Sequence, residues 1–407
     1  MKAPAVAIDV HHALTPELRE RIIDDIRTRI QEPSYRLLSP EQLRELARLD
    51  TGGPPLVSLY LQLTPERRVG RAWHSAFSAL AHQISHLLDK KERAAVEADL
   101  GQIERTLSDQ LPVLGRGVVF FVCRERGIWR QIALPIPLPD QVRFASRTYL
   151  RPLLRGWGRH DRMLIALLSR QQSRFFTTHL GNIEEIYRVK GQRIRGMLTD
   201  RVPRDRRDAV ATQVLKDEAK ALASMAEMIS HEFETSHILL SAPPDMSAAF
   251  CDHLSRASLD RVAPFEVSIH ASPAEIAAAA APVQQQVRKR AERQVVDRLC
   301  EAAPGAMSTG TQETLDCLRD GRVLSLVADD SYAARGMHCR QCRGLFEPPQ
   351  IAACPRCGSA ELEPVDDLVE AALQHALDQK AAVTFIRDPD CRKAFTAMAP
   401  LRAWLRY

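Results

Sequence analysis

The sequence has few aromatic residues and no long apolar run. Aromatic side chains make up 5% of the 407 residues, which argues against an extended base-stacking platform. No apolar run approaches the roughly 20 residues that span a bilayer. The stretch from Met1 to Val6 lacks the apolar core of a secretory signal, because polar residues return at Asp9. These absences predict a cytoplasmic protein without a membrane partner.

The common catalytic motifs are also missing. The sequence contains no G-x-S-x-G, no phosphate-binding G-x-x-x-x-G-K and no H-E-x-x-H. The strand expected over 163–169 carries no carboxylate, although a metal-dependent nuclease would need one there. The sequence therefore disfavours a nuclease and offers no standard catalytic constellation.

Length and composition indicate a globular protein with several domains. A chain of 407 residues exceeds one ordinary hydrophobic core and implies two or three domains. Its 56 basic and 51 acidic residues leave a net charge of only +5, so the position of the charge is more informative than its sum. The nine cysteines are an odd number and do not fit a disulfide framework in a reducing compartment.

Hydrophobic patterning predicts three α/β units, at residues 1–150, 151–270 and 271–407. In the first unit we expect a helix from Pro16 and further elements at 56–61, 73–88, 117–123 and 128–134. In the second we expect strands at 163–168, 174–178, 183–189, 237–240 and 265–269, with a helix over 208–231. In the third we expect a helix from the capping box Ser272 to Glu275, kinked at Pro282, then elements at 323–327, 365–377 and 382–386 and a short basic tail.

Two cysteine pairs form the most specific motif. Cys339 and Cys342 are followed by Cys354 and Cys357, and Gly358 permits the tight turn that such a pair needs. Paired thiolates two residues apart can bind one tetrahedral ion, and four sulfur ligands leave no open position for catalysis. We therefore predict a structural zinc ribbon inserted at 337–363. Unrelated free thiols and a redox pair are the alternatives.

Positive charge is concentrated over residues 188–207. Eight basic and two acidic residues give this stretch a net charge of +6, more than that of the whole chain. Arginine predominates, and its planar guanidinium suits contacts with phosphate. We interpret the stretch as RNA-binding, with a solvated surface as the alternative. The predicted RNA-binding residues are Arg188, Lys190, Arg193, Arg195, Arg201, Arg204, Arg206 and Arg207.

A second arginine series recurs every four residues. Its members are Arg143, Arg147, Arg151, Arg155 and Arg159. On one helix these guanidinium groups would share a face and repel one another, although Pro152, Gly156 and Gly158 interrupt a helix there. An anionic partner would explain the series, and a solvated face is the alternative.

Several separate stretches resemble the bacterial branch of the archaeo-eukaryotic release factor and Pelota superfamily, specifically its family ten. The residues that carry this resemblance are 162–165, His237 to Pro244, His270 to Glu275, 314–323 and the cysteine pairs that follow. The resemblance covers residues 145–407 in sequence and the first 145 residues by position and coarse pattern.

The resemblance implies three domains. These are an amino-terminal domain that faces the decoding site, a central ribonuclease H-like domain, and a carboxy-terminal domain of the L7Ae type with an inserted zinc ribbon. It also implies a transfer-RNA-shaped protein that enters the ribosomal A site. Apart from the resemblance, we expect a monomer with structural zinc as cofactor and a translational GTPase as a candidate partner.

The resemblance is incomplete at the functional motifs. Release factors of the superfamily carry a Gly-Gly-Gln loop that helps to position the hydrolytic water. Here Gly191 and Gln192 match its last two residues, and Lys190 replaces the first glycine. The Asn-Ile-Lys-Ser and Tyr-x-Cys-x-x-x-Phe elements that read stop codons are missing. Stop-codon decoding is therefore not expected.

Three functional hypotheses follow. The missing motifs favour a non-catalytic protein that occupies the ribosomal A site, either in hibernation, as relatives of the Balon type do, or in recognition of stalled ribosomes. The alternative is an enzyme, a codon-independent peptidyl-tRNA hydrolase that rescues stalled ribosomes through Gln192. A third hypothesis is a zinc-ribbon module that binds another protein.

Overall fold

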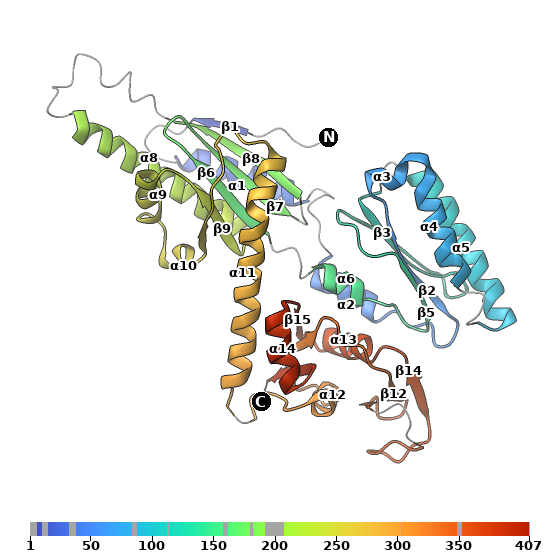
Figure 1. Cartoon of the computed structure of the whole chain (residues 1–407). Coiled ribbons are helices and arrows are strands. Elements are labelled where there is room, and N and C mark those ends of the chain that lie inside the picture. The colour runs from blue at the N-terminus through green and yellow to red at the C-terminus, as the bar shows by residue number, and fades with distance from the viewer. Residues whose placement is uncertain are drawn as a thin grey trace. The chain divides into compact units, whose positions relative to one another are not determined.

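The chain forms two compact units, each assembled from two separate stretches of sequence (Figure 1). Unit 1 combines Met1–Leu37 with His160–Arg290, and unit 2 combines Leu38–Arg159 with Ala291–Tyr407. The computed structural model describes residues 6–9, 15–31, 38–83, 88–111, 114–157, 162–179, 182–191, 207–303, 305–347 and 352–406. The predicted multidomain α/β class is confirmed, whereas the predicted boundaries at 150 and 270 differ from this division.

Unit 1 is built on a six-stranded mixed sheet in the order β1-β8-β7-β6-β9-β10. The strands are β1 (Val6–Asp9), β6 (Met163–Leu168), β7 (Gln172–His179), β8 (Asn182–Lys190), β9 (His237–Ser241) and β10 (Val262–Pro264). Every residue of β6 is buried, as expected for a continuous apolar run at the centre of a sheet. β6, β9 and β10 run parallel, and β7 is antiparallel to both of its neighbours.

The strand predicted over 265–269 is wrong. Pairing ends at β10, and the chain then turns so that the Ala271 N–H donates to the Ser268 carbonyl. The buried Arg174 guanidinium holds this turn, because it donates to the carbonyls of Ile269 and Ala271 at 2.9 Å each.

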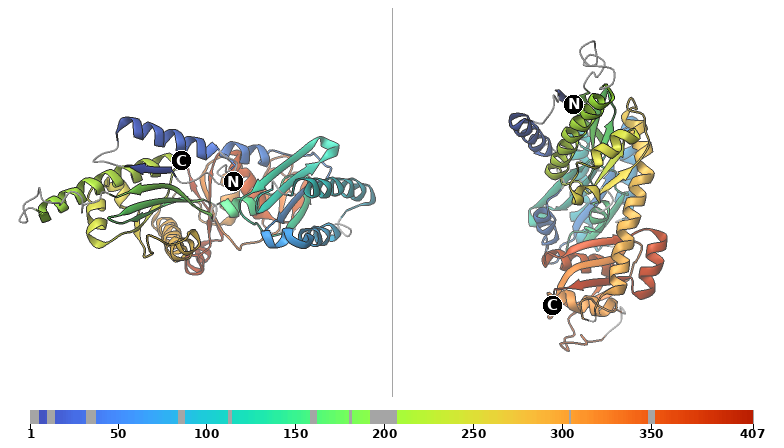
Figure 2. Two further views of the ribbon diagram at one scale, coloured as in Figure 1. Left: turned by 90° about the horizontal axis from the view of Figure 1, so that it is seen from above. Right: turned by 90° about the vertical axis from the view of Figure 1, so that its left-hand side faces the viewer.

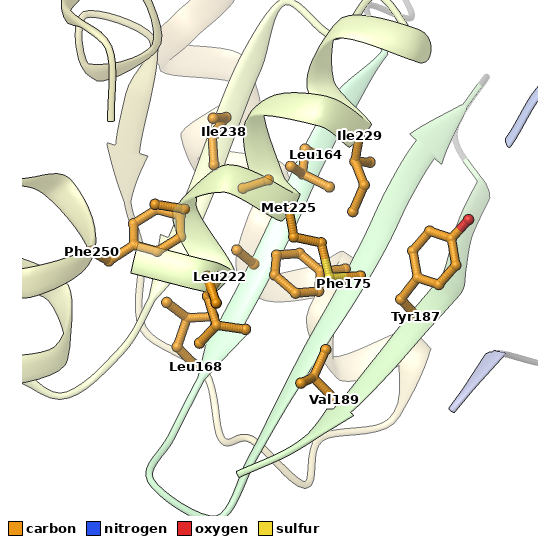
Figure 3. Close-up of a cluster of buried hydrophobic side chains, with 14 of the residues drawn as sticks. Leu164, Leu168, Phe175, Tyr187, Val189, Leu222, Met225, Ile229, Ile238 and Phe250 are labelled. Carbon is orange, nitrogen blue, oxygen red and sulfur yellow. The ribbon is translucent and has the colours of Figure 1, made fainter. Parts of the chain in front are cut away.

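Helices cover both faces of the unit 1 sheet. They are α1 (Pro16–Gln31), α8 (Arg207–Glu232), α9 (Pro244–Cys251), α10 (Arg256–Leu259) and α11 (Pro273–Glu301). α1, α8 and α9 pack on the face that carries Phe175 and Tyr187, and Figure 3 shows this core. The first half of α11 packs on the opposite face, beside Phe176. Its predicted capping box is confirmed, since Glu275 accepts the Ser272 N–H at 2.7 Å and donates its own N–H to Ser272 at 3.3 Å.

Residues 6–9 and 15–31 belong to unit 1, although the sequence pattern placed them with residues 38–150. β1 pairs in parallel with β8, and α1 packs against α8 (Figure 2). Ile22 and Ile26 of α1 are buried in the unit 1 core. The Tyr187 hydroxyl of β8 lies 2.7 Å from the Asp25 carboxylate. The first part of the chain is therefore a structural part of unit 1.

The described residues of unit 2 form three sheets. The strands of its first sheet, in the order β4-β3-β2-β5, are β2 (Leu56–Gln62), β3 (Gly117–Cys123), β4 (Ile128–Leu134) and β5 (Gln141–Ala145). This sheet is antiparallel throughout, and α4 (Ala72–His82) and α5 (Lys90–Gln110) pack on one face of it. Short helices α2 (Pro40–Ala47) and α6 (Arg151–Trp157) flank the sheet in sequence, and α3 (Pro65–Arg68) lies between β2 and α4.

The second part of unit 2 contains the other two sheets. Their strands are β11 (Val323–Asp329), β15 (Ala382–Ile386) and β16 (Leu401–Leu405) in one sheet, and β12 (Gly336–Cys339), β13 (Leu345–Phe346) and β14 (Leu362–Val365) in the other. The helices are α12 (Thr311–Arg319), α13 (Leu368–Asp378) and α14 (Pro389–Met398).

None of the helices described here combines the length and apolar character that a membrane crossing requires.

The predicted basic tail after residue 386 is wrong. Asp388 caps α14 by accepting N–H groups of Asp390 and Cys391. The chain then returns as β16, which pairs with β11 and buries Leu401 and Ala403. Scattered basic residues concealed these apolar positions in the sequence.

Truncation of Ile26 should destabilise unit 1 alone. The side chain is fully buried, so we expect Ile26→Ala to lower the free energy of unfolding of this unit by about 2–5 kcal/mol. All four tryptophans lie in unit 2. In urea, the circular dichroism transition should therefore shift while the tryptophan fluorescence midpoint stays constant. The exposed-site variant Arg21→Ala is the control, and an equal shift of both signals would contradict the assignment of α1 to unit 1.

Candidate metal centre and nucleic-acid interface

The four predicted cysteine ligands come together at the small sheet of unit 2. Their Sγ atoms all lie within 4.8 Å of one another. Sγ of Cys339 is 3.6 Å from that of Cys357, and Sγ of Cys342 is 3.5 Å from that of Cys354. β12 ends at Cys339, which is buried, whereas Cys357 is exposed. The two pairs that the sequence separates thus form one cluster.

Tight turns position each cysteine pair. The Gly358 N–H donates to the Cys354 carbonyl at 2.9 Å, and Gly358 has a φ of +72°, as its place after the second pair predicted. In the first turn, the Arg343 N–H donates to the Cys339 carbonyl at 2.8 Å, and the Cys339 N–H donates to the Gly344 carbonyl at 2.9 Å. Both turns therefore aim two thiols at the same point.

The donor set fits a tetrahedral metal ion. Burial, together with hydrogen bonds from the neighbouring cysteine sulfurs, raises the pKa of Cys342 to about 12. Four thiolates this close together repel one another unless a cation compensates their charge. A divalent ion would take all four as thiolates, and zinc prefers this set of ligands. Cys339, Cys342, Cys354 and Cys357 would then hold the ion with no position left for water, so its chemistry would be structural.

Protein purified without added metal should contain about one equivalent of zinc per chain. Cys354→Ser should abolish this content, because three sulfurs hold the ion less tightly than four. Cys300→Ser is the matched control, since Cys300 is exposed and lies outside the cluster. Elemental analysis measures the zinc content. A metal-free chain whose four clustered thiols all react with a thiol reagent in the folded state would contradict the prediction.

The structure describes only the edges of the predicted RNA-binding stretch. Arg188 and Lys190 lie on β8, and α8 begins at Arg207. Gln192, Arg193, Arg195, Arg201, Arg204 and Arg206 lie outside the described residues. Their predicted roles stay predictions.

Part of the local positive charge at this edge is compensated. The Glu185 carboxylate accepts two hydrogen bonds from Arg188, at 2.8 and 2.9 Å, and two from the buried Arg174, at 3.1 and 2.6 Å. These two guanidinium groups lower the pKa of Glu185 despite its burial. Lys190 is exposed at the end of β8. Counting charge over residues 188–207 therefore overestimates the contribution of Arg188.

Gly191 is required by local packing. Its N–H donates to the Gln171 carbonyl at 2.8 Å, in the turn between β6 and β7. A Cβ atom on residue 191 would lie 2.5 Å from the Arg170 carbonyl oxygen and 2.8 Å from the Gln171 carbonyl carbon. Only glycine fits this approach of two backbones. The glycine next to Gln192 thus has a structural reason that is independent of catalysis.

Gly191→Ala should destabilise unit 1 by about 1–3 kcal/mol, because backbone atoms on both sides of the contact must move. Gly101→Ala is the matched control. Gly101 lies in α5, where a new Cβ meets nothing within 4 Å, and alanine is the better helix former. Urea unfolding followed by circular dichroism measures both variants. Equal stability of Gly191→Ala and the wild type would contradict the packing explanation.

The second arginine series does not form a free face for an anionic partner, so that hypothesis is wrong for its central members. Arg143 lies on β5, and only Arg151 and Arg155 share a helix. Arg147 pairs with Asp50 at 3.0 Å. Arg155 binds both carboxylate oxygens of Asp330 at 2.6 Å. Arg159 lies outside the described residues.

Arg151 is the most enclosed member of the series. It is 5% exposed, and Nη1 lies 3.0 Å from each carboxylate oxygen of Asp367. Glu370, also buried, accepts the N–H groups of Leu150 and Arg151 at 2.7 Å each. Sequence reasoning missed Asp367 and Glu370, because more than 200 positions separate them from their partners. Their only local signal is an acidic first turn of α13.

A search of curated proteins finds no match. The crystal structure of the archaeal translation termination factor aRF1 aligns with 90% of this chain and 96% of its own, at 16% identity and a TM-score of 0.24. Archaeoglobus fulgidus Pelota aligns with 72% of this chain and 79% of its own, at 12% identity and a TM-score of 0.34.

A third similar structure is archaeal Pelota bound to the ribosome together with ABCE1. It aligns with 72% of this chain and 77% of its own, at 14% identity and a TM-score of 0.39. Residues 149–285 match the sequence model of bacterial archaeo-eukaryotic release factor family 10. This match lies within residues 145–407, the part of the chain whose sequence resembles the same family.

Proposed function

We propose that the protein binds the ribosome and occupies the A site as a transfer-RNA mimic, without decoding stop codons. It acts in hibernation or in recognition of stalled ribosomes. Residues 188–207 contact ribosomal RNA through phosphate groups, the central part of the chain is ribonuclease H-like, and the carboxy-terminal part is L7Ae-like with a structural zinc ribbon.

The family match over residues 149–285 carries this proposal. That segment contains the whole basic stretch, whose net charge of +6 exceeds the +5 of the chain. Arginine-rich segments of this kind bind RNA mainly through phosphate, so affinity should fall steeply as salt increases. Among the described residues, Lys190 and the start of α8 at Arg207 border the stretch.

Reversal of charge in the basic stretch should remove the protein from ribosomes. We expect a chain in which Arg193, Arg195, Arg204 and Arg206 are all changed to glutamate to bind at least about tenfold more weakly, with a smaller salt dependence. Co-sedimentation with purified ribosomes at several salt concentrations measures both quantities. A chain carrying Lys216→Glu and Lys220→Glu is the control, because these exposed cations lie on α8 of the same unit. Unchanged co-sedimentation of the fourfold variant would remove this role.

Peptide release separates the binding factor from the alternative enzyme. Lys190 occupies the position of the first glycine, and its backbone pairs with Gln172 and Asp9 on the two flanking strands. This paired position favours binding over catalysis, so we expect the wild type to release no peptide from stalled ribosomes. Release that Gln192→Ala abolishes would instead favour a peptidyl-tRNA hydrolase.

A further inference from the structure

The cysteine cluster and helix α6 are joined by a short path of hydrogen bonds. The insert that carries the cysteines leaves the body of unit 2 after β11 and returns to it at α13. β12 and β14 pair from Cys339 opposite Leu362 to Gly336 opposite Val365. The Leu368 N–H then donates to the Ala334 carbonyl at 2.8 Å, which closes the base of the insert.

Arg151 of α6 contacts both backbone segments at the base of the insert, the one that enters it and the one that leaves it. One amino group of the Arg151 guanidinium donates to the carbonyls of Asp330 and Tyr332, on the segment that enters the insert. The other amino group lies 3.0 Å from each carboxylate oxygen of Asp367, on the segment that leaves the insert. A single buried guanidinium therefore spans the two ends of the insert.

Glu370 completes the contact by capping α6 from α13. The N–H groups of Leu150 and Arg151 stand at the start of α6 and have no partner within the helix. Each donates to one oxygen of Glu370 at 2.7 Å, and Gln374 donates to the same carboxylate at 3.0 Å. A helix of seven residues is not stable alone. The first turn of α6 thus depends on Glu370, which lies two positions after Leu368 at the base of the insert.

We propose that metal occupancy of the four-cysteine cluster is coupled to the docking of α6. An ion that fixes Cys339 also fixes the β12 and β14 pair, the base of the insert, and the positions of Asp367 and Glu370. Loss of the ion releases these groups and loosens residues 148–157. The chain continues from α6 into unit 1 at residue 160. This inference rests on the cluster binding a metal.

Hydrogen exchange of the full-length chain tests the coupling. We expect amide exchange in peptides covering residues 148–157 to become at least about fivefold faster after zinc is removed with a chelator. The measurement is made at pH 8, above the pKa of about 7 to which burial raises Glu370. Peptides covering residues 382–398, in β15 and α14, should keep their protection. Unchanged exchange at 148–157 after complete zinc loss overturns the proposal, and so does an equal increase in both regions, which is general unfolding.

Coupling of this kind is reciprocal, so damage to α6 capping must weaken metal binding. Glutamine has one acceptor oxygen, so Glu370→Gln leaves one N–H of α6 facing an amide NH2. We expect this variant to hold zinc at least about fivefold more weakly in competition with a chromogenic chelator.

Asp378→Asn is the matched control for Glu370→Gln. Asp378 is also an acidic residue of α13, but it is exposed and lies 3.7 Å from Arg48. We expect its zinc affinity to change less than twofold. Equal zinc affinity of Glu370→Gln and wild type overturns the proposal, as does a chain that binds no zinc at all. Neither result depends on whether the protein binds ribosomes, so failure here leaves the proposed function standing.

Discussion

The arrangement of unit 2 depends on the burial of one arginine. Arg151 is 5% exposed, and a guanidinium removed from water is tolerated only where carboxylates and carbonyls surround it. Asp367 and the carbonyls of Asp330 and Tyr332 meet this requirement where α6 contacts the start of α13. Removing one partner of such a buried pair typically costs about 3–5 kcal/mol. The pairing therefore specifies how residues 38–159 dock onto residues 291–407.

The sequence predicted well those features whose determinants lie close together in the chain. Strands β3, β4, β6 and β15 match their predicted ranges. β3 and β6 are continuous apolar runs, and β4 follows β3 after a charged turn that ends in glycine. The cysteine cluster was predictable for the same reason, since each turn supplies two ligands three positions apart. In both cases the local spacing alone determines the structure.

Features that depend on distant partners were not predictable in this way. The apolar face of α1 indicates that Ile22 and Ile26 are buried, but it does not indicate what covers them. The arginine spacing from 143 to 159 suggested one helix face with an anionic partner. The anions are instead Asp50, Asp330 and Asp367 of the same unit. A charge pattern in one window cannot reveal carboxylates that the fold brings from elsewhere.

The same reasoning limits what the Gly-Gln pair alone can indicate. Two separate requirements act on residues 190 and 191: the backbone of Lys190 is paired on both sides within the sheet, and Gly191 must pass close to the Arg170 carbonyl. A release-factor loop needs freedom at its first glycine, and a residue held between two strands lacks that freedom. Most of the positive charge of residues 188–207 lies after Gly191 in the sequence. Binding through phosphate needs only that charge, whereas catalysis would also need a positioned glutamine.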